Sequence, residues 1–304
     1  MRGLTLKQFS GIEAIARHGR ITGAAGELHV TPAALTARLR QLEDTLGLVL
    51  FDRTRQGLKL TEAGQTVLQA AEQVRAALTE CTDRLASLRG IASGRVRIAV
   101  VSTAKYFAPY AIAAFGRRHP GLDMQLHVGN REETIARLAD YSADIAVMGR
   151  PARDFPVEHL VIGDHPLVLV AAPGHPLAHR PELPIDQLSH ETFLVREPGS
   201  GTRTVFEALA RRMSRQPTIA MEIASNETIK QAVMAGLGIA LLSAHAAGAE
   251  IADGRLVILP VEDLPIRRQW YAVRRADRHA TPAMAAFWAF LAEQRDALLP
   301  QMAV

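Results

Sequence analysis

The chain has 304 residues, of which 48% are hydrophobic and 22% are charged. This length allows about two domains with sizeable cores, and the composition is that of a globular protein rather than a disordered or fibrous one. The single cysteine excludes an intrachain disulfide. No apolar signal-peptide segment and no membrane-length apolar run is evident, so we expect a cytoplasmic protein without a membrane partner.

The net charge of +4 is modest, but it is unevenly distributed. Residues 1–60 contain nine Lys or Arg and five Asp or Glu, so this first fifth of the chain accounts for the whole excess. A local excess of basic residues is typical of a nucleic-acid-binding module.

After a first helix expected over residues 4–18, residues 22–43 read as a helix, a tight turn and a second helix. The second helix is expected to begin at Thr31-Pro32, because Thr is a good N-cap and Pro is tolerated at the first helical position. One of its faces carries leucines, and the other carries small, hydroxylated or basic residues that suit a major groove. The DNA contacts predicted from this helix are Thr31, Pro32, Ala33, Thr36, Arg38 and Arg40.

A basic hairpin is expected directly after these helices, with short strands at residues 51–54 and 58–60. Arg53 and Arg55 on this hairpin are predicted to contact the DNA backbone or minor groove. A helix-turn-helix followed by a basic hairpin predicts a winged helix-turn-helix. For the two helices alone, an ordinary helical hairpin with a solvated face remains an alternative.

The pattern AA-x-x-L-x-V-T-x-x-A-L-T-x-x-L-x-x-L-E-x-x-L-G-x-x-L-F-x-R, followed by L-T-x-A-G, runs from Ala24 to Gly64. It is similar to the N-terminal domain of LysR-type transcriptional regulators. The chain departs from the family at Pro32-Ala33, where Gln-Pro is usual, and at Gln56, where Arg is usual. The resemblance implies a regulator that binds a double-stranded DNA operator. It implies three segments, namely a winged helix-turn-helix at 1–60, a linker helix at 61–90 and an effector-binding domain at 91–304.

The linker helix is expected to run from Glu62 to about Arg89 and carries an apolar seam with alternating spacings of four and three residues. The seam comprises Val67, Ala71, Val74, Leu78, Cys81, Leu85 and Leu88. Packing of this helix on its own domain is the alternative. A long helix between two domains has little else to bury against, so we expect a partner chain and a homodimer or homotetramer.

From Arg95 onward, strands and helices alternate, which predicts parallel sheets covered by helices. Two such runs in sequence, with the last segment returning to the first, resemble the α/β two-lobed, periplasmic-binding-protein-like fold of the family's effector domain. Lobe I is expected at about 91–163 and 266–304, and lobe II at about 164–265.

In such sheets a ligand binds beyond the carboxyl ends of the strands, between the lobes. The segments after the strands carry hydroxyls, amides and cations, and helix N-termini are expected after Ser102 and after Gly201. Together with Arg196, this set favours an anionic ligand with a phosphate or carboxylate group. The predicted effector contacts are Ser102, Thr103, Lys105, Asn130, Arg131, Arg150, Ser200, Thr202 and Arg203.

Residues 102–107, 129–133, 148–151 and 165–167 look like the Calvin-cycle (RuBisCO-operon) regulators within the LysR-type family. This resemblance implies control of carbon-fixation genes with a sugar phosphate, another phosphorylated metabolite or NADPH as effector. It leaves RNA polymerase as a further partner. A LysR-type regulator of another operon, with a carboxylate effector, stays open.

The sequence shows no evident catalytic or metal-binding motif, and we expect no resident cofactor. Gly199-Ser200-Gly201 lacks the spacing of a nucleophile elbow, and no P-loop follows it. Pro176 prevents a regular helix from presenting both His175 and His179 to a metal. An α/β enzyme fused to a DNA-binding domain is therefore disfavoured. The winged helix likewise disfavours a solute-binding protein of a transporter.

Overall fold

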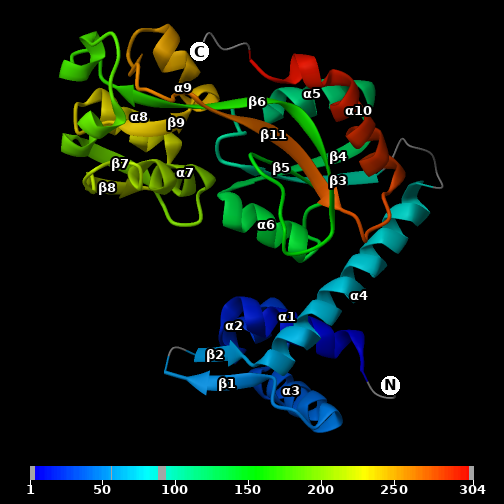
Figure 1. The fold of residues 1–304 in the computed structure, drawn as a ribbon. Coiled ribbons are helices and arrows are strands. Elements are labelled where there is room, and N and C mark those ends of the chain that lie inside the picture. Colours follow the sequence, from blue (N-terminus) through cyan, green and yellow to red (C-terminus); the bar gives the residue numbers. More distant parts are fainter. Residues whose placement is uncertain (1–3, 56, 88–93, 301–304) are drawn as a thin grey trace. The chain divides into compact units, whose positions relative to one another are not determined.

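The computed structural model describes residues 4–55, 57–87 and 94–300 (Figure 1). Its contacts divide the chain into two units, residues 1–82 and residues 83–304. Among the described residues, no helix combines the length and apolar character needed to cross a membrane.

The first unit packs helices and a two-stranded wing around one core. Its elements are α1 (Leu6–His18), α2 (Ile21–Glu27), α3 (Pro32–Leu46), β1 (Phe51–Thr54), β2 (Gly57–Leu60) and α4 (Glu62–Ser87). Thr31 caps α3 as predicted, because its Oγ1 accepts the backbone N–H of Ala34 at 3.2 Å. Leu35 and Leu42 of α3 are buried, which confirms its apolar face. Leu6 lies in the first turn of α1 and is 52% exposed.

Two glycines let the wing and α4 approach the rest of this unit closely. The N–H of Leu58 donates to the carbonyl of Gly19 at 2.8 Å, and a Cβ on Gly57 would lie 2.4 Å from that oxygen. A Cβ on Gly64, in the first turn of α4, would lie 2.1 Å from the carbonyl of Leu50. Both positions therefore require glycine, and the wing has a fixed place beside α1.

The apolar seam of α4 is not uniform along its length. Val67 packs against the core of its own unit, contrary to the expectation that it faces a partner chain. Ala71 is also buried, whereas Leu78, Cys81 and Leu85 are exposed. Val74 is half-buried, and Leu88 lies outside the described residues.

The second unit has two lobes. Lobe I begins with β3 (Gly94–Val101), α5 (Ala108–Arg118), β4 (Leu122–Gly129), α6 (Arg131–Ala139) and β5 (Ile145–Met148), in which β3 pairs in parallel with β4 and β5. Lobe II contains β7 (Thr192–Arg196), α7 (Gly201–Ala210), β8 (Thr218–Ile223), α8 (Asn226–Met234), β9 (Ala240–Ser243), α9 (Ala244–Ala252), β10 (Val257–Ile258) and the 3-10 turns η1 (Pro176–His179) and η2 (Ile185–His190). Helix α10 (Pro282–Leu298) returns to the lobe I core, as the sequence predicts.

Two long antiparallel strands, β6 (Val157–Ala171) and β11 (Ile266–Arg275), belong to both lobes (Figure 1). One part of β6 pairs only with β11, and its last residues pair with β9 and β10 of lobe II. The sequence predicts only the second half of β6, from residue 167. The first half contains exposed Glu158 and His159 and a bulge between Val161 and Gly163, and these interrupt the apolar pattern of a buried strand.

Candidate functional site

In the first unit, the exposed face of α3 lies between two hollows. The hollow between α3 and the wing is lined by Gly19, Arg20, Ile21, Thr36, Leu39, Arg40, Glu43, Val49, Phe51, Arg53, Thr54, Gly57 and Leu58. The hollow on the other side of α3 is lined by Ala33, Thr36, Ala37, Arg40, Gln41, Asp44 and Thr45. Thr36 and Arg40 border both hollows, so the predicted recognition face is the ridge between them.

The basic residues of this surface are free to meet phosphates. Arg40, Arg53 and Arg55 are exposed, and none has a carboxylate partner among the residues that the structure describes. Thr31, Pro32, Arg38 and Arg55 line neither hollow. Arg20 was not among the predicted DNA contacts, but it lines the hollow beside the wing.

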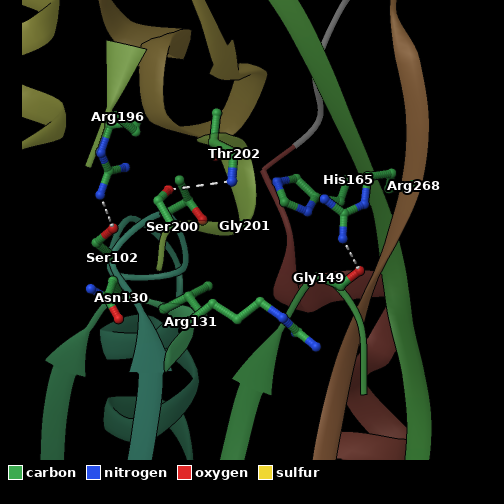
Figure 2. A pocket seen from close by; sticks show the side chains of 12 residues that line it. Ser102, Asn130, Arg131, Gly149, His165, Arg196, Ser200, Gly201, Thr202 and Arg268 are labelled. Carbon is green, nitrogen blue, oxygen red and sulfur yellow. Dashed lines mark hydrogen bonds between the residues drawn. The ribbon is translucent and has the colours of Figure 1, made fainter. Parts of the chain in front are cut away.

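The second unit has a cavity between its lobes, which we call the interlobe cleft (Figure 2). Its lining is Val101, Ser102, Thr103, Asn130, Arg131, Gly149, His165, Arg196, Ser200, Gly201, Thr202 and Arg268. The fold thus brings together six of the predicted contacts, namely Ser102, Thr103, Asn130, Arg131, Ser200 and Thr202. They come from three strand ends of lobe I and lobe II that are distant in sequence.

Direct hydrogen bonds join the lobes at the edge of the cleft. Buried Arg196 donates from Nη2 to the hydroxyl of Ser102 at 3.1 Å (Figure 2). Its Nη1 donates to Oδ1 of Asn226. The N–H of Glu132 donates to the carbonyl of Gly199 at 3.3 Å. The structure therefore shows the lobes in contact across the cleft.

A second group of interlobe contacts lies at Tyr106. Its hydroxyl donates to Oε1 of Glu227 at 2.5 Å, and Lys105 pairs with the same carboxylate at 3.3 Å. Burial, and then the hydrogen bond to Glu227, raise the pKa of Tyr106 strongly. Burial opposes ionisation of Glu227, but the bonds from Tyr106 and Lys230 outweigh it and lower the pKa of that carboxyl. Lys105 therefore joins the lobes and does not line the cleft.

One of the two helix N-termini expected at the cleft is wrong. Residues 102–107 form consecutive turns, and α5 begins only at Ala108. Lobe I instead presents the N-terminus of α6, capped by Asn130, whose Oδ1 accepts the N–H of Glu133 at 2.9 Å. Lobe II presents the N-terminus of α7, capped by Ser200, as predicted.

Two arginines place positive charge in the cleft without a neutralising carboxylate. Arg131 donates to the carbonyls of Arg150 and Pro151, the latter at 3.2 Å, and Arg268 donates to the carbonyl of Gly149 at 2.8 Å. Neither guanidinium is paired with an acid within the described part of the chain. Burial, then Arg268 and Arg150, lower the pKa of Arg131, and burial, then Arg150, lower that of Arg268. Burial is the larger cause of both shifts, the neighbouring guanidiniums add to it, and the charge of Asp154 opposes it at Arg131.

The other two predicted cations lie elsewhere. Arg203 pairs with Glu207 at 2.8 Å and with Glu222 at 3.2 Å, so its charge is already compensated. Arg150 is exposed and does not line the cleft. A position just after a strand was therefore not sufficient to bring Arg150 and Arg203 into the interlobe cleft.

Sequence reasoning missed His165 and Arg268, which lie opposite each other on β6 and β11. It recognised the segment beginning at His165 only as a family resemblance. Arg268 lies within a predicted strand, where no local pattern distinguishes it from an ordinary surface cation. The described residues contain no cluster of three or more groups that could hold a metal ion.

Comparison with known families accounts for almost the whole chain. Residues 6–65 match the bacterial regulatory helix-turn-helix protein model of the lysR family, and residues 89–296 match the LysR substrate binding domain. The chain belongs to the LysR family. It is therefore a DNA-binding transcriptional regulator and not an enzyme.

Relatives within the LysR family are similar over their full length. The HTH-type transcriptional regulator CbbR of Sinorhizobium medicae (strain WSM419) is 50% identical over 301 residues, covering 99% of this chain and 96% of the relative. CbbR of Xanthobacter flavus is 46% identical, covering 98% and 90%. The RuBisCO operon transcriptional regulator of Allochromatium vinosum is 42% identical, covering 95% of each. The resemblance to RuBisCO-operon regulators expected from the cleft segments is confirmed.

Two solved structures are informative. The regulatory domain of CcmR from Synechocystis PCC6803, solved in complex with 2-PG, is 34% identical with a TM-score of 0.65, covering 68% of this chain and 99% of that one. Full-length CbnR in complex with its target DNA is 21% identical with a TM-score of 0.65, covering 95% and 99%. The second likeness concerns the fold alone, and it confirms the expected arrangement of a winged helix-turn-helix followed by a two-lobed α/β domain.

Proposed function

We propose that this protein regulates carbon-fixation genes and that a small phosphorylated metabolite in the interlobe cleft controls its operator binding. The observation that carries the proposal is the pair of uncompensated guanidiniums, Arg131 and Arg268, beside the N-terminus of α7. Helix N-termini and arginines are the groups that proteins use most directly to hold phosphate. The names of the full-length relatives, and 2-PG in the CcmR domain, support the same assignment.

The size of the cleft favours a small ligand. With the lobes in contact, the space open to the centres of water-sized molecules is about 30 Å³. That is room for roughly two waters, so even a phosphate group requires some opening. NADPH would need a much wider opening, and we therefore place it second to a small phosphorylated metabolite. If the protein instead regulates another operon, a carboxylate effector would bind the same cations but would need fewer of them.

The lobes provide the means of signalling. Ligand held by Arg131 of lobe I and by the first turn of α7 in lobe II would stabilise the arrangement in which both reach it. Such a ligand shifts the population of lobe arrangements and, through them, that of the DNA-binding units. In this proposal the protein acts in the cytoplasm, with operator DNA and RNA polymerase as its macromolecular partners.

We also propose a homodimer or homotetramer formed through the distal part of α4. Leu78 and Leu85 are 47% and 59% exposed, although the same seam is buried at Ala71. Leu78→Asp should give smaller species in sedimentation, because a charge in an apolar helix interface is costly. Gln73→Asp, exposed but off the seam, is the matched control. Unchanged mass of the Leu78→Asp protein would refute assembly through this seam.

The function is tested by thermal shift of the full chain against phosphorylated metabolites, NADPH and small carboxylates. The best ligand is then titrated into a complex with a carbon-fixation promoter fragment. We expect a phosphorylated compound to stabilise the protein and to alter operator affinity. Stabilisation by carboxylates alone would favour the other-operon alternative, and the absence of any anion effect would refute the cleft as effector site.

A further inference from the structure

Strands β6 and β11, which join the two lobes, form one wall of the interlobe cleft. His165 on β6 and Arg268 on β11 are direct cross-strand partners, so their side chains emerge on the same face of the sheet. Both line the cleft, between the contributions of lobe I and lobe II (Figure 2). A ligand there would contact the strands that join the lobes as well as the lobes themselves.

His165 is buried and polar, and it is incompletely bonded. It is only 3% exposed, and neither of its ring nitrogens has a hydrogen-bond partner within the described residues. Its ring stacks on Trp270, with centroids 3.7 Å apart and planes inclined by 15°, and this fixes the ring plane. An unsatisfied buried nitrogen is costly, so a ring held in this way at a cavity wall needs a partner from inside the cavity.

The surroundings of the ring favour one tautomer. A Cβ on Gly149 would lie 2.8 Å from Nδ1 of His165 and 3.3 Å from Nη2 of Arg268, so both groups lie against the same glycine. The positive guanidinium favours a lone pair, not a proton, on Nδ1. The proton then resides on Nε2, the ring nitrogen that lies farther from Gly149.

The charge of the ring follows from the groups around it. The groups whose charge acts on the ring are Arg268 on β11 and His245 on α9, and Arg131 on α6 lines the same cleft. Burial, then Arg268 and His245, lower the pKa of His165 well below its usual value. Nothing in this set offers His165 a counter-ion, so the ring is an uncharged donor beside two charged ones.

We propose that His165 is a ligand-contacting residue whose uncharged Nε2–H donates to an oxygen of a tetrahedral oxyanion held between Arg131, Arg268 and the N-terminus of α7. This inference rests on the proposed function and names the head group that the cleft accepts. All of these groups are hydrogen-bond donors, so the ligand oxygens that they contact can be unprotonated. The cleft should therefore take a phosphomonoester, inorganic phosphate or sulfate by the same contacts.

The experiment uses the full chain and Trp270 as reporter. The sequence has two tryptophans, so Trp288→Phe leaves only the one that stacks on His165. Inorganic phosphate and sulfate are titrated by fluorescence into this protein and into its His165→Phe and His165→Gln derivatives. Calorimetry with the best phosphorylated ligand gives a second readout. Phe keeps the stacking but has no donor, and Gln keeps an uncharged donor of similar reach.

We expect His165→Phe to weaken binding of each anion about tenfold to a hundredfold. His165→Gln should stay within about threefold of the parent. Sulfate affinity should be flat between about pH 6 and pH 8, since the donor is uncharged there. Equal loss in both variants would overturn the donor role, as would unchanged binding in His165→Phe. Sulfate affinity that rises as the pH falls through this range would show a charged imidazole and refute the neutral donor.

The same titrations separate this inference from the proposed function. If Arg131→Ala weakens anion binding and His165→Phe does not, the cleft is the effector site and the inference about His165 is wrong. If the parent protein binds none of the anions, both are wrong. Effector-free operator binding and the thermal melt of each variant verify that it is folded.

Discussion

The arginines of the two units are held in opposite ways. In the first unit Arg40 and Arg53 are exposed and have no carboxylate partner among the described residues. In the cleft Arg196 is only 2% exposed and is bonded to Ser102, Asn226 and Glu197. An exposed cation keeps its hydration until a phosphate displaces it, whereas a buried cation must be satisfied by the fold beforehand. The first kind is available to a ligand, and the second is part of the structure.

The largest effect is therefore expected at Arg196. Arg196→Ala should lower the free energy of unfolding by about 3 kcal/mol, because it leaves buried Asn226 and Glu197 without their donor and breaks the bond to Ser102. Arg267→Ala, at an exposed position on β11, should cost less than about 0.5 kcal/mol. Urea denaturation of both variants measures the difference. Equal free energies of unfolding in the two variants would show that buried Arg196 contributes no more to stability than exposed Arg267.

Arg131 should matter for ligand rather than for stability. Arg131→Ala should weaken binding of the best phosphorylated ligand about tenfold to a hundredfold, because a charge-assisted bond is lost. Arg203→Ala is the matched control, since its guanidinium is occupied by Glu207 and Glu222 and does not line the cleft. Calorimetric titration decides, and an equal loss in the two variants would show that long-range charge, not contact, controls affinity.

Substitution of Arg53 tests whether the exposed arginines of the first unit contact DNA. Arg53→Ala should weaken binding to all DNA sequences alike and reduce the slope of log affinity against log salt by about 0.9, the value for one phosphate contact. Lys7→Ala is the control, because Lys7 is exposed on α1 outside both hollows beside α3. Binding isotherms at several salt concentrations provide the slope. A slope unaffected by Arg53→Ala would remove the wing from the DNA contacts.

The smallest expected effect is on the loss of folding stability at acidic pH. Because the pKa of folded His165 lies well below that of the unfolded residue, the unfolded chain takes up a proton first as the pH falls. Stability is therefore full above about pH 6.5 and declines below it, by about 1 kcal/mol at pH 5.5 from this residue. His165→Phe should lose that part of the decline, as urea denaturation at pH 5.5 and 7.5 would show. An identical pH dependence in both proteins would mean that the pKa of His165 is the same in the folded and unfolded chain.

Features whose signal is local could be predicted from the sequence. Thr31-Pro32 begins a helix because a side-chain cap and a fixed φ act within one turn. The wing follows from short strands around a turn, and the order of the lobes follows from alternating strands and helices. The expected N-terminus of α5 after Ser102 was wrong, since the chain first makes turns over residues 102–107 and no cap distinguishes these from a helix start.

The composition of the cleft was decided by tertiary structure. The strand-end rule placed Ser102, Asn130 and Arg131 together, because the parallel strands β3 and β4 end at one edge of their sheet, and it placed Ser200 at the facing strand end of lobe II. It equally favoured Lys105 and Arg203, which the fold instead pairs with Glu227 and with Glu207 and Glu222. His165 and Arg268 meet only because β6 and β11 pair in one register, more than a hundred residues apart in the chain. The sequence by itself determined the family and the helix-turn-helix, and it predicts an anionic ligand. Tertiary pairing decided which cations remain free to bind it, because a charge is available only where the fold provides no counter-ion.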